Sequence, residues 1–351
     1  MRLAFPLMGN YSVPSKYLFS KICNCEIIDS PSITTKTVEL GSKYSPDFLC
    51  TPFKYTLGTY IECLNMGADT LIQMGGGCRY GYYYKLQEKI LKDLGYNFKY
   101  YNLVSMGHAD IKVIYKILKE INPNLKIIKS IYYFLITKKM IKYIDYVEDY
   151  IRENGGFANT CELNKIHDNL LLEFSSVKNF CELNKVYKRN LKLLKSVKVN
   201  KNKKRIKIGI IGELYTLMES FANYNIEDIL IKNNVEIKRF TNVTYLLFEK
   251  RKKVKKYLKE LKDAKYRMGA DALDNIYHTH YLIDNNYDGI IHIKSSFCTP
   301  EIGSMGIINK ICEENNMPVL FLSMDLNTSK VGFETRIEAF LDMIEMRMDS
   351  E

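Results

Sequence analysis

Short apolar segments alternate with helical patterns in the first and last parts of this 351-residue chain. The apolar runs span residues 2–8, 25–29, 70–74 and 97–104 in the first part, and residues 206–213, 235–243, 287–295 and 318–325 in the last part. Strand–helix–strand repetition predicts parallel sheets, because two parallel strands need a crossover segment between them. We therefore predict an α/β protein with two Rossmann-like parallel-sheet domains.

The middle of the chain has helical periodicity almost throughout, most clearly at residues 111–121, 126–154 and 181–197. A basic stretch follows, because eleven Lys or Arg and no Asp or Glu occur from Lys185 to Lys207. We predict three parts: an N-terminal Rossmann-like domain at residues 1–108, a helical middle region with a basic linker at 109–204, and a C-terminal Rossmann-like domain at 205–351.

Charge and hydropathy narrow the class of protein. The formal net charge is +11, and a second basic cluster lies at residues 249–262. These clusters predict either a solvated helix face with a linker, or a docking face for an acidic partner or a nucleotide-bearing substrate. Nucleic acid is not expected as a partner, since no helix-turn-helix, RNP-type or zinc-finger pattern occurs. The absence of a long apolar run excludes a membrane span, and residues 1–16 do not resemble a signal peptide, so a cytoplasmic location is expected.

Three of the nine cysteines have similar surroundings. Cys50, Cys78 and Cys298 each follow a segment expected to end a strand, and each lies beside Gly or Pro. Ligand sites of parallel sheets form at the carboxyl ends of strands, so we predict that the three thiols meet in a cleft between the two sheet domains. Thiolates are the ligands of iron–sulfur clusters, and Arg79 is a suitable counter-charge for such an anionic group.

Two other interpretations of these cysteines stay open. A single buried cysteine is usually a packing residue, and three thiolates with one open position also suit zinc. Cys23 and Cys25 are expected to share one face of a strand, without a second ligand pair at zinc-site spacing. Packing roles are expected for the cysteines inside helical patterns, namely Cys63, Cys161, Cys181 and Cys312.

Other polar residues give weaker signals. Glu213 follows a lone glycine turn and is expected to be structural, with lining of the cleft as the alternative. His278 and His280 have a spacing that does not suit a helical metal chelate, and a core role is favoured for His292. Neither glycine-rich turn is a P-loop, because no Gly-Lys-Ser/Thr follows.

Five blocks of sequence together resemble a known family. The chain is similar to the 2-hydroxyacyl-CoA dehydratase D-component superfamily, and most of all to its shorter branch of CoA protein activase or acyl-CoA dehydratase activase-related proteins. The blocks are residues 45–69, 75–96, 212–216, 287–304 and 322–344.

This resemblance implies two Rossmann-like domains with a helical domain, and a 4Fe-4S cluster held by Cys50, Cys78 and Cys298 with one iron left open. Arg79 and Glu301 would be its neighbours. It also implies a separate ATP-hydrolysing activase of the actin-like ATPase class, which delivers a low-potential electron for dehydration or reduction of an acyl-CoA-type substrate. A homodimer is compatible with this interpretation. The alternative is a zinc- or thiol-stabilised interaction module without catalytic activity.

Overall fold

The computed structural model describes residues 1–76, 78–104, 110–200, 205–264 and 268–350. The chain divides into two compact units, residues 1–139 and 140–351. The borders expected for a separate middle region, at residues 108–109 and 204, lie outside the described residues. The three-part division therefore stays a prediction.

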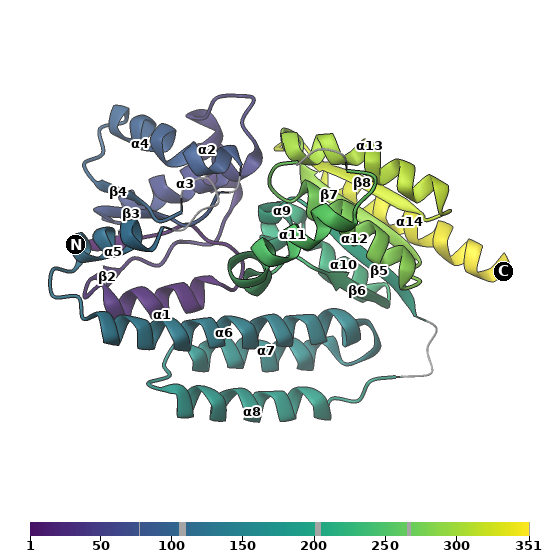
Figure 1. Cartoon of the computed structure of the whole chain (residues 1–351), viewed down its shortest axis with the longest axis horizontal. Helices are drawn as coiled ribbons and strands as arrows, with labels where there is room; N and C mark the ends of the chain where they lie inside the picture. Colours follow the sequence, from purple (N-terminus) through teal and green to yellow (C-terminus); the bar gives the residue numbers. More distant parts are fainter. Residues whose placement is uncertain (77, 105–109, 201–204, 265–267, 351) are drawn as a thin grey trace. The chain divides into compact units, whose positions relative to one another are not determined.

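The first unit contains a four-stranded parallel sheet with the order β2-β1-β3-β4 (Figure 1). Its strands are β1 (Arg2–Ala4), β2 (Glu26–Ile27), β3 (Thr70–Gln73) and β4 (Lys99–Asn102). All four residues of β3 are buried, as expected for the central strand of a sheet that is covered on both faces.

Helices cover both faces of this sheet. Leu71 of β3 packs in a core with Leu57 and Tyr60, whereas the next residue, Ile72, packs with Phe19 and Ile121 on the opposite face. The helices that contribute to the unit are α1 (Ser12–Ile22), α2 (Thr35–Lys43), α3 (Thr51–Asn65), α4 (Tyr83–Asp93), α5 (Ile111–Ile121) and the start of α6 (Ile127–Asn154).

Helices α2 and α3 cross at two glycines. A Cβ atom on Gly41 would lie 1.8 Å from the Lys54 carbonyl oxygen, and one on Gly58 would lie 1.9 Å from the Thr37 carbonyl oxygen. The two backbones therefore approach so closely that only glycine fits at both positions. This crossing fixes α2 against α3, whose first residue follows Cys50.

The second unit repeats the same strand order. Its sheet is parallel with the order β6-β5-β7-β8. Its strands are β5 (Ile206–Gly212), β6 (Val235–Arg239), β7 (Gly289–Ser295) and β8 (Val319–Met324). Two four-stranded parallel sheets with crossover helices confirm the predicted α/β class and its two Rossmann-like halves.

Both faces of the second sheet are also covered. Gly209 of β5 lies against Leu282, whereas the neighbouring Ile208 lies with Ile344 near Gly289. The helices and helical turns around this sheet are α9 (Leu214–Met218), η3 (Ser220–Asn223), α10 (Ile226–Lys232), η4 (Tyr245–Glu249), α11 (Lys250–Glu260), α12 (Ala272–Asp284), α13 (Thr299–Glu314) and α14 (Lys330–Ser350).

The helical segment predicted in the middle of the chain consists of α5, α6, the turn η2 (Gly155–Phe157), α7 (Thr160–Phe174) and α8 (Phe180–Ser196). Within the second unit, the Tyr143 ring of α6 stacks on the Tyr187 ring of α8 at 3.5 Å between centroids. The Tyr143 hydroxyl also donates to Asn184 Oδ1 at 2.6 Å. These contacts join α8 to the C-terminal half of α6.

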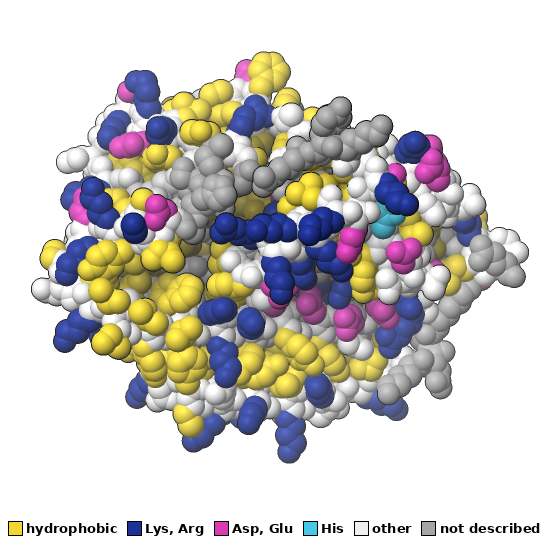
Figure 2. Space-filling model, viewed as in Figure 1, with side chains coloured by type: hydrophobic (Ala, Val, Ile, Leu, Met, Phe, Trp, Pro, Cys, Tyr) yellow, Lys and Arg dark blue, Asp and Glu magenta, His cyan; other side chains and the backbone are white. Residues whose placement is uncertain are grey.

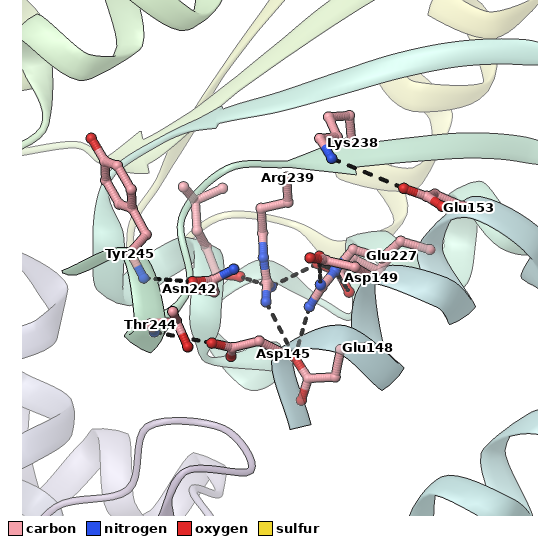
Figure 3. A network of polar contacts seen from close by, with 12 residues as sticks. Asp145, Glu148, Asp149, Glu153, Glu227, Lys238, Arg239, Asn242, Thr244 and Tyr245 are labelled. Atoms are coloured by element: carbon pink, nitrogen blue, oxygen red, sulfur yellow. Dashed lines mark hydrogen bonds and ion pairs between the residues drawn. The ribbon is translucent and has the colours of Figure 1, made fainter. Parts of the chain in front are cut away.

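A buried ionic network joins the end of α6 to the second sheet (Figure 3). The Arg152 side chain is 3% exposed and contacts Glu148, Asp149 and Glu227 at 2.7–3.0 Å. Arg239 of β6 donates to Glu227 at 2.7 Å and to the carbonyl of Leu217 at 2.8 Å. Since each guanidinium has several charged partners, the network holds α6, α10 and β6 together.

The surface carries two kinds of patch. Figure 2 shows Lys and Arg side chains gathered over α11, where Arg251, Lys252 and Lys255 are exposed while Tyr257 is buried. It also shows hydrophobic side chains over the N-terminal part of α6, where Ile128 is 86% exposed. In the part of the chain that is described, no helix is long and apolar enough to cross a bilayer.

We expect the substitution Arg152→Ala to lower the free energy of unfolding by about 3–5 kcal/mol, because it removes one of the two buried guanidinium groups that offset the charges of Glu148 and Glu227. The matched control is Arg189→Ala, which removes an exposed ion pair with Glu173 and should cost no more than about 1 kcal/mol. Urea denaturation of the two variants measures the difference. Equal losses would contradict the role assigned to the network.

Candidate functional site

Cys50 lies at the start of a helix and not at the end of a strand. Residues 47–50 form a turn, and Cys50 is the N-cap of α3, followed by Thr51 and Pro52. The expected strand end at this position is therefore wrong. The reason is Pro52, which is well suited to the first turn of a helix and so favours helix initiation directly after Cys50.

Cys78 follows the carboxyl end of β3, as predicted. Its thiol accepts a hydrogen bond from the Tyr80 backbone N–H at 3.5 Å. A Cβ on Gly76 would lie 2.4 Å from the Gly81 backbone, so the turn before Cys78 closes tightly on the turn after it. Gly77, the third glycine of the motif, lies outside the described residues. The loop is anchored by the Gln73 amide, which donates to the Tyr80 carbonyl at 2.7 Å.

The first unit brings Cys50 and Cys78 toward one phenol. A short hydrogen bond joins the Cys50 Sγ to the Tyr83 hydroxyl. Burial raises the pKa of Tyr83; Cys50 and then Cys78 raise it further, while Arg79 lowers it. The ring of Tyr83 lies 5.2 Å from that of Tyr80, whose backbone N–H donates to Cys78, so the two cysteines contact two neighbouring tyrosines.

Cys298 repeats the local structure of Cys50. It is the N-cap of α13 and is followed by Thr299 and Pro300, so the same Cys-Thr-Pro tripeptide opens both helices. Cys298 is 8% exposed and follows the carboxyl end of β7. A helix N-terminus favours an anionic group, and both thiols are therefore in positions that favour the thiolate form.

Lys294 is a cation beside Cys298 that sequence analysis missed. Its side chain is buried near the end of β7, and its amino group donates to the carbonyls of Ser295 and Ser296 at 3.5 Å. Burial lowers the pKa of Lys294, while Cys298 and Glu301 oppose that change. The sequence signal for this residue was a lysine four positions before Cys298, in a segment expected to be a buried strand.

Glu301 lies behind Cys298 in a fully buried polar cluster. Its Oε2 atom contacts His292 Nε2 at 2.8 Å and accepts from Asn275 Nδ2 at 2.8 Å. Asn275 also binds Gly212, accepting from its N–H at 3.2 Å and donating to its carbonyl at 3.1 Å. Glu301 Oε1 and His292 Nδ1 have no hydrogen-bond partner within the described ranges. His292 is thus a buried residue, as predicted, held by Glu301.

Glu213 acts as a helix cap. Its carboxylate accepts from the backbone N–H groups of Tyr215 and Thr216, both at 2.9 Å, at the start of α9. Burial raises the pKa of Glu213 to about 7, against the hydrogen bonds from Thr216 and Tyr215. These contacts favour the structural interpretation of this residue.

The two histidines of the 278–280 segment have separate roles. His278 is buried and stacks on Phe240 at 4.0 Å between ring centroids. Burial lowers the pKa of His278 to about 3, with further lowering by Lys253 and Lys250. His280 contacts Asp263 at 2.9 Å at the surface. A surface or core role was expected for this pair, and His278 lies in the core whereas His280 lies at the surface of α12.

The remaining cysteines differ partly from expectation. Cys63 and Cys312 are buried in helices, as predicted, whereas Cys161 and Cys181 are exposed on α7 and α8 and are not packing residues. The Cys23–Cys25 segment is a turn between α1 and β2, not a strand. Across the described part of the chain, no group of three or more His, Cys, Asp or Glu is placed to hold a metal ion.

The fold and these residues define a Rossmann-like α/β protein with thiols at helix starts. Residues 255–344 match the family model described as 2-hydroxyglutaryl-CoA dehydratase, D-component. This match confirms the resemblance to the 2-hydroxyacyl-CoA dehydratase D-component superfamily over a segment that includes Cys298 and Glu301. Cys50 and Cys78 lie outside that segment. No curated protein matches the sequence.

We expect the pKa of Glu213 to make stability depend on pH. In the folded chain the Glu213 carboxyl group stays protonated up to a pH of about 7, whereas the ordinary pKa of a glutamate is 4.5. The contribution of the group is therefore complete below pH 4.5 and is lost as the pH rises to about 7. The loss amounts to about 3 kcal/mol at most.

Urea denaturation between pH 4 and pH 8 measures this effect. The variant Glu213→Gln cannot titrate and should show a smaller decline than the wild-type protein. Glu314→Gln, at an exposed position of α13, serves as the control and should leave the pH dependence unchanged. An identical pH dependence in wild type and Glu213→Gln would contradict the raised pKa.

Proposed function

We propose that this protein is an iron–sulfur component of the dehydratase type, in which Cys50, Cys78 and Cys298 bind one 4Fe-4S cluster. The observation that carries the proposal is the placement of two cysteines around one pair of tyrosines. Cys50 bonds to the Tyr83 hydroxyl, and Cys78 accepts from the N–H of Tyr80, whose ring lies 5.2 Å from that of Tyr83. The family match over the segment with Cys298 gives independent support. When bound, such a cluster supplies one-electron transfer at low potential.

The local chemistry of each cysteine fits thiolate ligation. Cys50 and Cys298 occupy the N-caps of long helices, where the helix dipole favours negative charge. Arg79 lies next to Cys78, and Lys294 acts electrostatically on Cys298. The positive charges of Arg79 and Lys294 would offset the negative charge of several thiolates.

Several residues would position these ligands. The Tyr83 hydroxyl orients the Cys50 thiol, and Gln73 holds the loop that carries Cys78. Glu301 fixes the first turn of α13 to Asn275 and His292. Because each of these groups is buried or half-buried, the thiols are held by the folded units before any ligand binds.

The partners follow from the same proposal. An ATP-hydrolysing activase of the actin-like class would deliver the electron, and an acyl-CoA-type substrate would undergo dehydration or reduction. The second candidate function is an interaction module stabilised by zinc or by thiols alone. It rests on the fact that three thiolates also suit zinc.

Metal analysis separates the two candidates. We expect protein purified without air to be brown and to contain about four iron atoms and four acid-labile sulfides per chain, as a 4Fe-4S cluster requires. Dithionite reduction should give an EPR signal. A colourless anaerobic preparation with zinc, or with no metal, would overturn the cluster proposal.

Substitution of single cysteines tests the ligand assignment. We expect Cys78→Ser to lose most of the bound iron, because the hydroxyl is a much weaker ligand for a cluster than a thiolate. Cys63→Ser is the matched control, since Cys63 is buried in α3 of the same unit and bonds to Ser30. Equal iron content in the two variants would show that other thiols bind the metal.

A further inference from the structure

Cys23 and Cys25 lie in a tight turn between the first helix and the second strand. Helix α1 ends at Ile22, Cys23 is its C-cap, and β2 begins at Glu26. Asn24, between the two cysteines, has a φ of +46°. This left-handed conformation is one that asparagine tolerates better than most residues.

The turn matters for the distance between the two thiols. In an extended chain, residues two apart are separated by roughly 6.6 Å, which is near the upper limit of the Cα separation that a disulfide spans, about 4.4–6.8 Å. Both side chains also lie against the same apolar core, with Cys23 inside it and Cys25 packed against it.

The two thiols are not equivalent. Cys23 is 1% exposed in an apolar core, whereas Cys25 is half-buried. The hydrogen bond from Cys23 lowers the pKa of Cys25, and the same interaction together with burial raises the pKa of Cys23. The accessible thiol is therefore also the better thiolate, while its neighbour keeps its proton.

The pair is separate from the proposed cluster ligands of its own unit. Cys25 precedes the amino end of β2, whereas Cys78 follows the carboxyl end of β3. Because all strands of this sheet are parallel, Cys25 lies at the amino ends of the strands and Cys78 at their carboxyl ends. Nothing in the proposed function uses Cys23 or Cys25.

We propose that Cys23 and Cys25 form a redox-active dithiol that reduces low-molecular-weight disulfides. The Cys25 thiolate attacks one sulfur of an external disulfide, forms a mixed disulfide and releases one thiolate of the reagent. Cys23 then attacks the Cys25 sulfur and gives up its proton, so the second reagent thiol leaves. Two protein thiols are oxidised to one intramolecular disulfide, and one external disulfide is reduced to two thiols.

The test uses the full-length protein and oxidised glutathione. After incubation, the remaining thiols are blocked with N-ethylmaleimide. The mass of the tryptic peptide from Ile22 to Lys36 is then measured by mass spectrometry. We expect most of this peptide to lack both maleimide groups and to be lighter than the reduced peptide by two hydrogen atoms. Full maleimide labelling of both cysteines at all glutathione concentrations would overturn the proposal.

Two variants test the assigned roles. In Cys23→Ser the reaction should stop at the first step, so Cys25 should carry glutathione as a stable mixed disulfide. In Cys25→Ser, Cys23 should remain a maleimide-labelled thiol. Glutathione on Cys23 in that variant, or a wild-type product that is only a mixed disulfide, would refute the proposed pair.

The outcome is independent of the cluster proposal. Iron content of the Cys23→Ser and Cys25→Ser proteins, measured after anaerobic purification, should equal that of the wild type. Failure of disulfide formation with full iron content would refute the dithiol alone, whereas absence of iron with normal disulfide formation would refute the cluster alone.

Discussion

Parallel pairing of the strands is the constraint on which the rest of the structure depends. A parallel neighbour is reached only through a crossover. Within each sheet, all strands therefore point the same way and their carboxyl ends lie together. In each unit the first and third strands are adjacent, which is where the chain changes direction across the sheet. The cysteines that follow β3 and β7 are placed by this topology.

The two units repeat the same plan with different chemistry. Cys78 and Cys298 follow the third strand of their sheets, so they occupy equivalent topological positions. Cys50 begins the helix before β3, and the equivalent residue before β7 is Asp271, the N-cap of α12. Asp271 is neutralised by Lys250, which also contacts Asp274 at 2.7 Å. The Cys50 thiol in the first unit thus corresponds to the Asp271 carboxylate in the second unit. The four equivalent positions therefore hold three cysteines and one aspartate.

The sequence was sufficient to predict the local elements. Alternating apolar runs and helical spacing predicted both parallel sheets, because burial on two faces favours mainly apolar strands, such as β7 with Ile290, Ile291 and Ile293. The position of Cys50 was predicted less well. It was expected at the end of a strand, but Pro52 favours a helix that starts directly after it.

Contacts between distant residues could not be derived from local patterns. Arg152 bonds to Glu227, 75 positions away, and Asn275 bonds to Gly212, 63 positions away. Such pairs depend on how the crossovers pack and not on any spacing in the chain. The turn at Asn24 was missed for a different reason, since two cysteines separated by one residue suit a strand equally well by pattern alone.

Asn275 imitates a piece of main chain. Its amide accepts from the N–H of Gly212 and donates to the carbonyl of the same residue, as an adjacent strand would. This pairing dictates which end of the amide is oxygen, so the second Nδ2 proton must point to Glu301 Oε2. That oxygen is therefore an acceptor for Asn275, and it also contacts Nε2 of the buried His292 ring at 2.8 Å. The direction of the Gly212 peptide thus fixes the orientation of one amide side chain, and through it one hydrogen bond of the buried Glu301 carboxyl group at the start of α13.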